Sequence, residues 1–239
     1  MIQCVTPEEC VIKIKASLAD GADALGVQLC RIKRELRTKE NLAKIFEACE
    51  ERPIYVTSYR HSENDGYTDE ECVGVLLLAL ECGATMLDIM GDMYDRGAKY
   101  ELTENPAAVK KQKALINKIH SSGGEVLMSS HTGNNLAVEE TLKIARAHED
   151  RGADVIKIVN TTKDIEDLPK SMETINTIYK TVNKKFLYLE SGPTQNIVRQ
   201  VGANLGVCMY LCCQYHGPFD TVEQPDLRRI KAVRDNIAF

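Results

Sequence analysis

The chain has 239 residues, of which 44% are hydrophobic and 27% charged, a composition typical of a folded globular protein. Lys and Arg total 30 against 35 Asp and Glu, which gives a net charge of -5. No basic run stands out, so the sequence speaks against nucleic-acid binding. The longest apolar stretch, residues 73–80, is far shorter than the ~20 residues that cross a bilayer. We therefore expect a cytoplasmic protein that binds neither nucleic acid nor membrane.

The number and spacing of the cysteines also indicate a reducing compartment such as the cytoplasm. There are nine, an odd number, and none of them form a Cys-x-x-Cys motif. Reduced, mostly buried thiols in a reducing compartment explain this pattern best.

Short apolar runs alternate with amphipathic stretches along the chain, which is the pattern of repeated β-α units around a parallel sheet. The predicted strands are 24–29, 54–59, 86–89, 125–129, 154–159, 186–189 and 206–210. The predicted helices are 39–50, 69–82, 106–121, 136–151, 165–182, 194–201 and 225–236. No Gly-x-Gly-x-x-Gly follows the first clear strand, so the usual dinucleotide-binding signal is missing.

A further helix is expected to begin at the N-terminus. Thr6 has the hydroxyl of a helix cap, Pro7 suits the first helical position, and Glu8 and Glu9 favour the positive end of the helix dipole. If residues 1–4 form a short strand, the tally becomes eight strands and eight helices. The sequence thus predicts an α/β fold, a (β/α)8 barrel that spans residues 1–239 as one domain.

In such a barrel the reacting groups lie at the carboxyl ends of the strands. Lys157 stands inside an apolar strand, Asp154 to Val159, where a lysine is unexpected. Burial favours its neutral amine, which can attack a ketone to form a Schiff base. A structural alternative is a lysine that extends its ammonium to the barrel mouth or pairs with an acid.

His131 comes just after the preceding strand, within Ser129-Ser-His131-Thr. A histidine beside Lys157 could move protons to and from an imine-bound substrate, although an isolated loop histidine is often only a surface residue. The other four histidines have no metal-ligand spacing, so no metal is expected.

Two arginines, Arg60 and Arg199, are expected at the same barrel end, which favours a carboxylate substrate. Ser191-Gly192-Pro193-Thr194 opens a helix where a phosphate could rest on backbone amides. Phosphosugar enzymes therefore stay open as a competing class.

These landmarks together resemble the type I 3-dehydroquinate dehydratase family, from about residue 24 to residue 230. The most specific part is Gly152-Ala-Asp-Val-Ile-Lys157-Ile, preceded by a strand that ends Ser-x-His131. The other matching features are Thr57-x-x-Arg60, the acidic loop Glu63-Asn-Asp-Gly66, Arg199-x-x-Gly202, Gly206 and Gln224.

The resemblance implies a lyase of the shikimate pathway and of aromatic amino acid biosynthesis, which dehydrates 3-dehydroquinate to 3-dehydroshikimate. Lys157 would form the imine and His131 would act as general acid and base, while Arg199 and Gln224 would hold the carboxylate. The family's supporting glutamate falls on Asn64, with Glu63 and Asp65 beside it, so the acid that supports His131 stays open, and Glu63 is taken as the candidate. The resemblance also implies a homodimer that uses no metal and no organic cofactor.

The chain departs from the family where substrate hydroxyls are bound. Gln28 and Cys30 stand in place of the family's Glu-x-Arg pair. Residues 214–224 are predicted to form a lid over the barrel mouth, and Asp220 falls near the position of the family's lid serine. Gln28, Arg60 and Asp220 are thus predicted to touch substrate. These departures keep two alternatives open: a Schiff-base lyase or class I aldolase-like enzyme for another keto acid or keto sugar, and a barrel that binds a metabolite without turnover.

Overall fold

The computed structural model describes residues 1–237. Its helices are α1 (Pro7–Ala19), α2 (Lys39–Glu47), α3 (Asp69–Glu81), α4 (Pro106–Ser121), α5 (Val138–Arg151), α6 (Leu168–Thr181), α7 (Gln195–Val201) and α8 (Leu227–Ile237). Its strands are β1 (Leu25–Gln28), β2 (Ile54–Thr57), β3 (Met86–Met90), β4 (Glu125–His131), β5 (Val155–Thr161) and β6 (Lys185–Ser191). Six of the predicted strands and all predicted helices are therefore present, and the prediction of an α/β fold is confirmed.

The start of α1 follows the predicted capping chemistry. Thr6 is the N-cap, and its hydroxyl accepts the amide of Glu9 at 3.3 Å. The Glu9 carboxylate in turn accepts the amide of Thr6 at 3.2 Å, which completes a capping box. The first turn is fixed by residues that lie next to one another in sequence.

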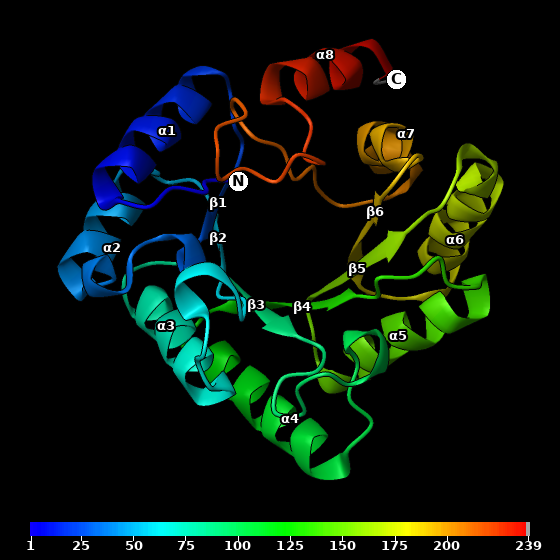
Figure 1. Ribbon diagram of the computed structural model, residues 1–239, viewed down its shortest axis with the longest axis horizontal. Coiled ribbons are helices and arrows are strands. Elements are labelled where there is room, and N and C mark those ends of the chain that lie inside the picture. Colours follow the sequence, from blue (N-terminus) through cyan, green and yellow to red (C-terminus); the bar gives the residue numbers. More distant parts are fainter. Residues whose placement is uncertain (238–239) are drawn as a thin grey trace. The chain divides into compact units, whose positions relative to one another are not determined.

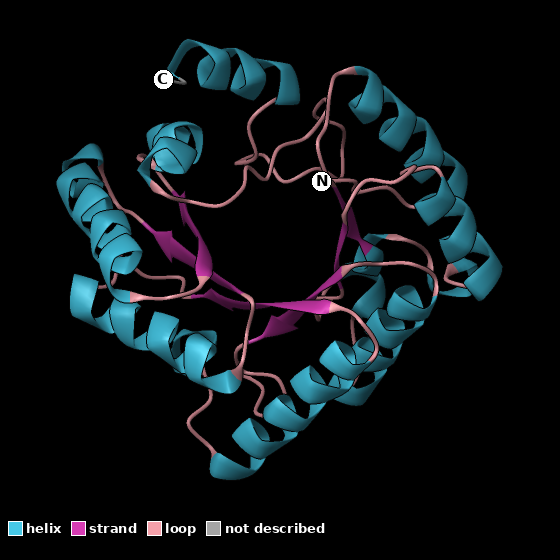
Figure 2. Cartoon of the chain, turned by 180° about the vertical axis from the view of Figure 1, so that it is seen from behind, coloured by secondary structure: helices cyan, strands magenta, loops and turns pink. Residues whose placement is uncertain are grey.

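The strand predicted at 206–210 is wrong. Gly206 has a left-handed φ of 99°, and the amide of Val207 donates to Gly202, so both residues belong to the turn that ends the preceding helix. Beyond them, the amide of Cys208 makes one bond to Phe186 at 2.9 Å. In Figure 2 the chain that follows α7 has the colour of a loop.

The short strand considered at 1–4 is reduced to one bridge, between Ile2 and Val27. The capping box explains why it is so short, because the amides of Val5 and Thr6 bind the Glu9 carboxylate instead of a neighbouring strand. Within residues 1–237 the structure has six named strands and not the eight that we predicted.

Contacts divide the chain into two compact units. The first comprises residues 1–88, 119–125 and 211–229, and the second comprises residues 89–118, 126–210 and the chain from Ile230 onward. In the first unit β1 pairs in parallel with β2, and β2 with β3. In the second, β4 pairs in parallel with β5, and β5 with β6. The single domain over 1–239 stays a prediction.

The core of each unit lies between its strands and its helices. In the second unit α5 and α6 cover one face of β5 and β6 (Figure 1). Gly152 ends α5 with a left-handed φ of 100°, which lets the chain turn into β5 after two residues. Fully buried side chains of this unit include Ile116, Leu127, Met128, Ile156, Ile158, Ile175 and Tyr188. The corresponding side chains of the first unit include Ile14, Leu29, Leu42, Ile45, Val56 and Leu76.

Candidate active site

Lys157 and His131 lie on neighbouring strands of the second unit and on the same face. In the parallel register of β4 and β5, Ser129 is opposite Lys157 and His131 is opposite Val159. Because side chains alternate along a strand, Ser129, His131 and Lys157 all point to one side. Lys157 is buried, with 4% of its surface exposed. The predicted lysine and histidine are thus brought to one face, one two-residue step apart.

The opposite face of these strands is covered by α5. Ser130 approaches the His148 ring nitrogen Nε2 at 3.0 Å, and the Asn160 amide donates to the Thr141 hydroxyl at 3.2 Å. His148 and Thr141 both belong to α5. The Lys157 amine therefore points away from the helix layer.

The acid that contacts His131 is Glu101. Its Oε2 lies 2.7 Å from Nδ1 of the imidazole, and the same oxygen accepts the backbone amide of His131. Since Nδ1 donates to the carboxylate, Nε2 is the basic nitrogen of the neutral ring. The pair is well placed for proton transfer, because the carboxylate fixes both the ring orientation and the tautomer.

Glu101 sits on a strained turn, Lys99–Glu101. Tyr100 has φ 61° and ψ 24°, and Glu101 has φ 51°, so two consecutive residues with side chains adopt the left-handed region. Each such residue costs about 1–2 kcal/mol, which other contacts must offset. The Ser130 hydroxyl donates to the Glu101 carbonyl at 2.8 Å, and the Arg151 guanidinium binds the carbonyls of Gly91 and Thr103 on either side of the turn.

Nothing in the sequence pattern singles out Glu101, because it stands in a loop among other charged residues. Glu190, by contrast, follows a predicted strand yet faces the helix layer. It is opposite Asn160 in the register and so lies on the face away from Lys157. Its carboxylate accepts the hydroxyls of Tyr188, at 2.8 Å, and Thr194. Burial, and then the neighbouring Glu190 charge, raise the pKa of Tyr188.

The two predicted carboxylate-binding arginines have partners within their own units. Arg199 lies on α7, is 8% exposed, and donates Nε to the Glu190 carbonyl at 2.9 Å. Arg60 follows β2 and donates to the Asp69 carboxylate from Nε at 2.6 Å and from Nη2 at 3.0 Å. Their roles toward a substrate stay predictions.

Gln28 and Glu63 both lie in the first unit. Gln28 ends β1 and is buried, with its amide nitrogen 3.6 Å from Cys30 Sγ and 3.4 Å from His61 Nε2. The carbonyl of Glu63 accepts Arg34 Nε. The role of Glu63 toward His131 stays a prediction, whereas Glu101 makes the contact directly.

The loop predicted as a lid is tied to the N-terminal segment of the first unit. The Asp220 carboxylate forms a buried ion pair with Lys13 of α1, 2.5 Å from Nζ to Oδ2, and Gln3 donates to Gln224 Oε1 at 3.1 Å. Sequence reasoning missed Lys13, although it lies between Cys10 and Ile14 on the apolar face of α1. That position is a detectable signal, since a lysine there needs a partner.

Within the described residues 1–237, no group of three or more histidine, cysteine, aspartate or glutamate side chains could hold a metal ion. No helix in that range is long and apolar enough to cross a membrane.

The site combines a buried lysine on a parallel strand with a histidine that a carboxylate holds in place. On an α/β fold, this combination is typical of a Schiff-base lyase. The comparisons with known proteins narrow this class. The model of the type I 3-dehydroquinase family matches residues 2–233, so the chain belongs to that family. No curated protein matches the sequence.

Solved structures share the fold at low sequence identity. The 3-dehydroquinate dehydratase from Geobacillus kaustophilus HTA426 is 14% identical with a TM-score of 0.81, and the match covers 100% of this chain and 90% of that one. The type I enzyme from Clostridium difficile is 15% identical with a TM-score of 0.81, covering 99% and 90%. The enzyme from Enterococcus faecalis is 17% identical with a TM-score of 0.76, covering 99% and 91%.

Family membership confirms the prediction made from the lysine segment. The protein is a hydro-lyase of the shikimate pathway, and its reaction is the dehydration of 3-dehydroquinate.

Proposed function

We propose that the protein dehydrates 3-dehydroquinate to 3-dehydroshikimate through an imine on Lys157, with His131 as the general acid and base. The observation that supports this most is the shared face of Lys157 and His131 on β5 and β4. The contact between Glu101 and His131 Nδ1 supports the histidine role.

The steps follow from these groups. The Lys157 amine adds to the ring ketone, and water leaves as the imine forms. His131 Nε2 removes a proton from the carbon next to the imine, whose nitrogen accepts the electron pair as an enamine. The electron pair then expels the hydroxyl on the next carbon, which takes the proton from His131 and departs as water. Hydrolysis of the imine releases a conjugated enone and restores the lysine.

Arg199 and Gln224 as carboxylate ligands, and Gln28, Arg60 and Asp220 as further substrate contacts, are part of the same proposal. They rest on the match of their positions to the family pattern. A homodimer and a cytoplasmic location are likewise proposed from the family resemblance and the composition.

Borohydride trapping tests the imine. Reduction in the presence of 3-dehydroquinate should add to the peptide that contains Lys157 the mass of the bound ligand less one oxygen, because the imine forms with loss of water and reduction adds two hydrogens. Reduction without substrate is the control. A protein that turns over substrate at a normal rate and gains no mass would refute the imine mechanism.

A second candidate keeps this chemistry and changes the substrate, and the trapping experiment must exclude it. Gln28 and Cys30 replace a charged pair of the family pattern, and Gln28 contacts the side chains of Cys30 and His61. An imine that is trapped on Lys157 while no enone absorbance develops would favour this second candidate. Absence of both would favour a barrel that binds a metabolite without turnover.

The Glu101 carboxylate is expected to act as a positioning residue. Changing Glu101→Gln should lower kcat roughly 10- to 100-fold with little change in KM, since the amide no longer holds the imidazolium form. Borohydride should still trap the imine, because Lys157 is intact. Glu63→Gln is the matched control and should leave kcat within about twofold of the wild type. If Glu63→Gln lowered kcat more than Glu101→Gln, Glu63 would be the acid that supports His131.

A further inference from the structure

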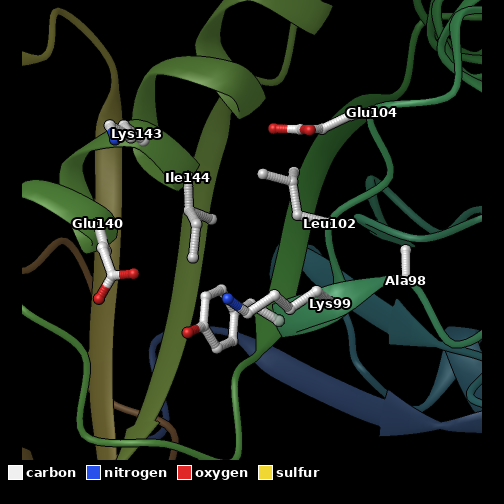
Figure 3. Close-up of a pocket in the computed structure, with 8 residues that line it drawn as sticks. Ala98, Lys99, Leu102, Glu104, Glu140, Lys143 and Ile144 are labelled. Carbon is white, nitrogen blue, oxygen red and sulfur yellow. The ribbon is translucent and has the colours of Figure 1, made fainter.

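The turn that holds Glu101 also forms one wall of a pocket in the second unit (Figure 3). The pocket has a volume of about 400 Å³ and lies between the segment 98–104 and helix α5. Its apolar lining comes from Ala98, Tyr100, Leu102 and Ile144. Ile144 is 2% exposed and belongs to the core, so the pocket has a fixed apolar base.

Each wall of this pocket carries one positive and one negative charge. Lys99 and Glu104 stand on the loop wall, and Lys143 and Glu140 stand on α5 (Figure 3). Lys99 Nζ lies 4.4 Å from the centre of the Tyr100 ring. Tyr100 first, and to a lesser extent the charge of Glu140, raise the pKa of Lys99. The pocket thus combines an apolar base with a rim that has two cations and two anions.

The other side of the same turn reaches the proposed active site. Tyr100 lines the pocket, and the next residue, Glu101, binds His131 Nδ1 at 2.7 Å. Both residues have left-handed backbone angles. Strain of this kind is concentrated in switch regions and ligand clamps, since a small change in contacts can alter the balance that maintains it. A ligand that packs on Tyr100 therefore bears directly on the position of Glu101.

We propose that this pocket binds an apolar α-amino acid and that binding shifts the Glu101–His131 pair. A carboxylate on the ligand would meet Lys143 or Lys99, its ammonium would meet Glu140 or Glu104, and an aliphatic or aromatic side chain would cover Ile144 and Leu102. A ligand with a single charge would leave half of the rim unmatched, and a ligand without an apolar body would leave the base exposed to water.

The coupling to His131 rests on the proposed function, but the binding does not. L-leucine and L-phenylalanine are suitable probes, titrated into the full chain without substrate by isothermal calorimetry. Matched probes that lack one charge are 3-methylbutylamine and 4-methylpentanoate. We expect measurable binding of the amino acids and at least 10-fold weaker binding of the matched probes.

Variants on α5 locate the site. Lys143→Gln and Glu140→Gln should each weaken binding roughly 10-fold, whereas Arg146→Gln and Glu139→Gln, which change charges on the same helix outside the pocket, should leave it unchanged. No binding of either amino acid, equal binding of the singly charged probes, or equal effects of the control variants would overturn the site.

The imidazole NMR signal of His131, identified by its loss in His131→Gln, reads out the coupling. It should shift progressively as ligand is titrated into the wild type, and in Lys143→Gln the same shift should need roughly 10-fold more ligand. Binding that leaves this signal unmoved would overturn the coupling. Since neither measurement uses turnover, failure of the imine test would leave both results interpretable.

Discussion

Replacing Lys157 with alanine should lower kcat/KM by roughly 10⁴-fold or more, the loss seen when covalent enzymes lose their nucleophile. Lys157 is the only residue of the proposed mechanism that bonds to the substrate, and His131 alone cannot stabilise the carbanion that proton removal creates. Borohydride should then add no mass to the protein. Both effects are measured with 3-dehydroquinate, one by enone absorbance and one by peptide mass.

Lys163→Ala is the matched control, since it removes an exposed lysine only two residues beyond the end of β5. It should keep normal turnover and normal trapping. Circular dichroism of both variants separates loss of chemistry from loss of fold. A Lys157→Ala protein that is folded and retains more than about a tenth of wild-type kcat/KM would contradict the imine mechanism.

Local signals explain how much of the fold could be predicted. The run from Val155 to Val159 is apolar apart from Lys157 and follows Gly152, and Thr6 with Glu9 forms a cap within four residues. Such features depend on neighbours in sequence, so the six strands fall within two residues of their predicted ends. The pattern of the lysine segment was likewise sufficient to indicate the family.

Features that depend on distant contacts were missed or misassigned. The segment 206–210 has the composition of a strand, but its first backbone amides donate hydrogen bonds within the turn after α7. Glu101 contacts His131 although the two are 30 residues apart in the chain. The turn that carries Glu101 has left-handed backbone angles, but no glycine at these positions indicates this in the sequence. Hydrophobic periodicity reports the faces of strands and helices, and it does not report which loop acid meets which histidine.

The predicted lid shows the same limit. The Gly-Pro pair in residues 214–224 predicts a loop. This prediction is confirmed, since the part of the chain that the structure describes, residues 1–237, has no helix or named strand there. The sequence did not show that Asp220 and Gln224 are buried against Lys13 and Gln3. The role of Asp220 toward a substrate stays a prediction, and its ion pair adds a contribution to stability that can be measured separately.

Asp220→Ser should lower the free energy of unfolding by about 3–5 kcal/mol, because it leaves the Lys13 ammonium buried without its carboxylate. Lys13 and Asp220 side chains are 4% and 1% exposed, and both carboxylate oxygens contact Nζ. The Tyr215 ring, 4.6 Å from Nζ, offsets only part of the loss. Urea unfolding followed by circular dichroism measures the change.

The double variant Lys13→Met with Asp220→Ser removes both charges and should recover most of the stability of the single variant, since no buried ion then lacks a partner. Glu8→Gln breaks the exposed pair with Lys44 and serves as the surface control, for which no measurable loss is expected. If Asp220→Ser were as stable as this control, the ion pair would not hold the loop against α1. If the double variant were instead as unstable as Asp220→Ser alone, the cost would come from the loop contact of Asp220 with the Gly217 amide and not from the unpaired lysine.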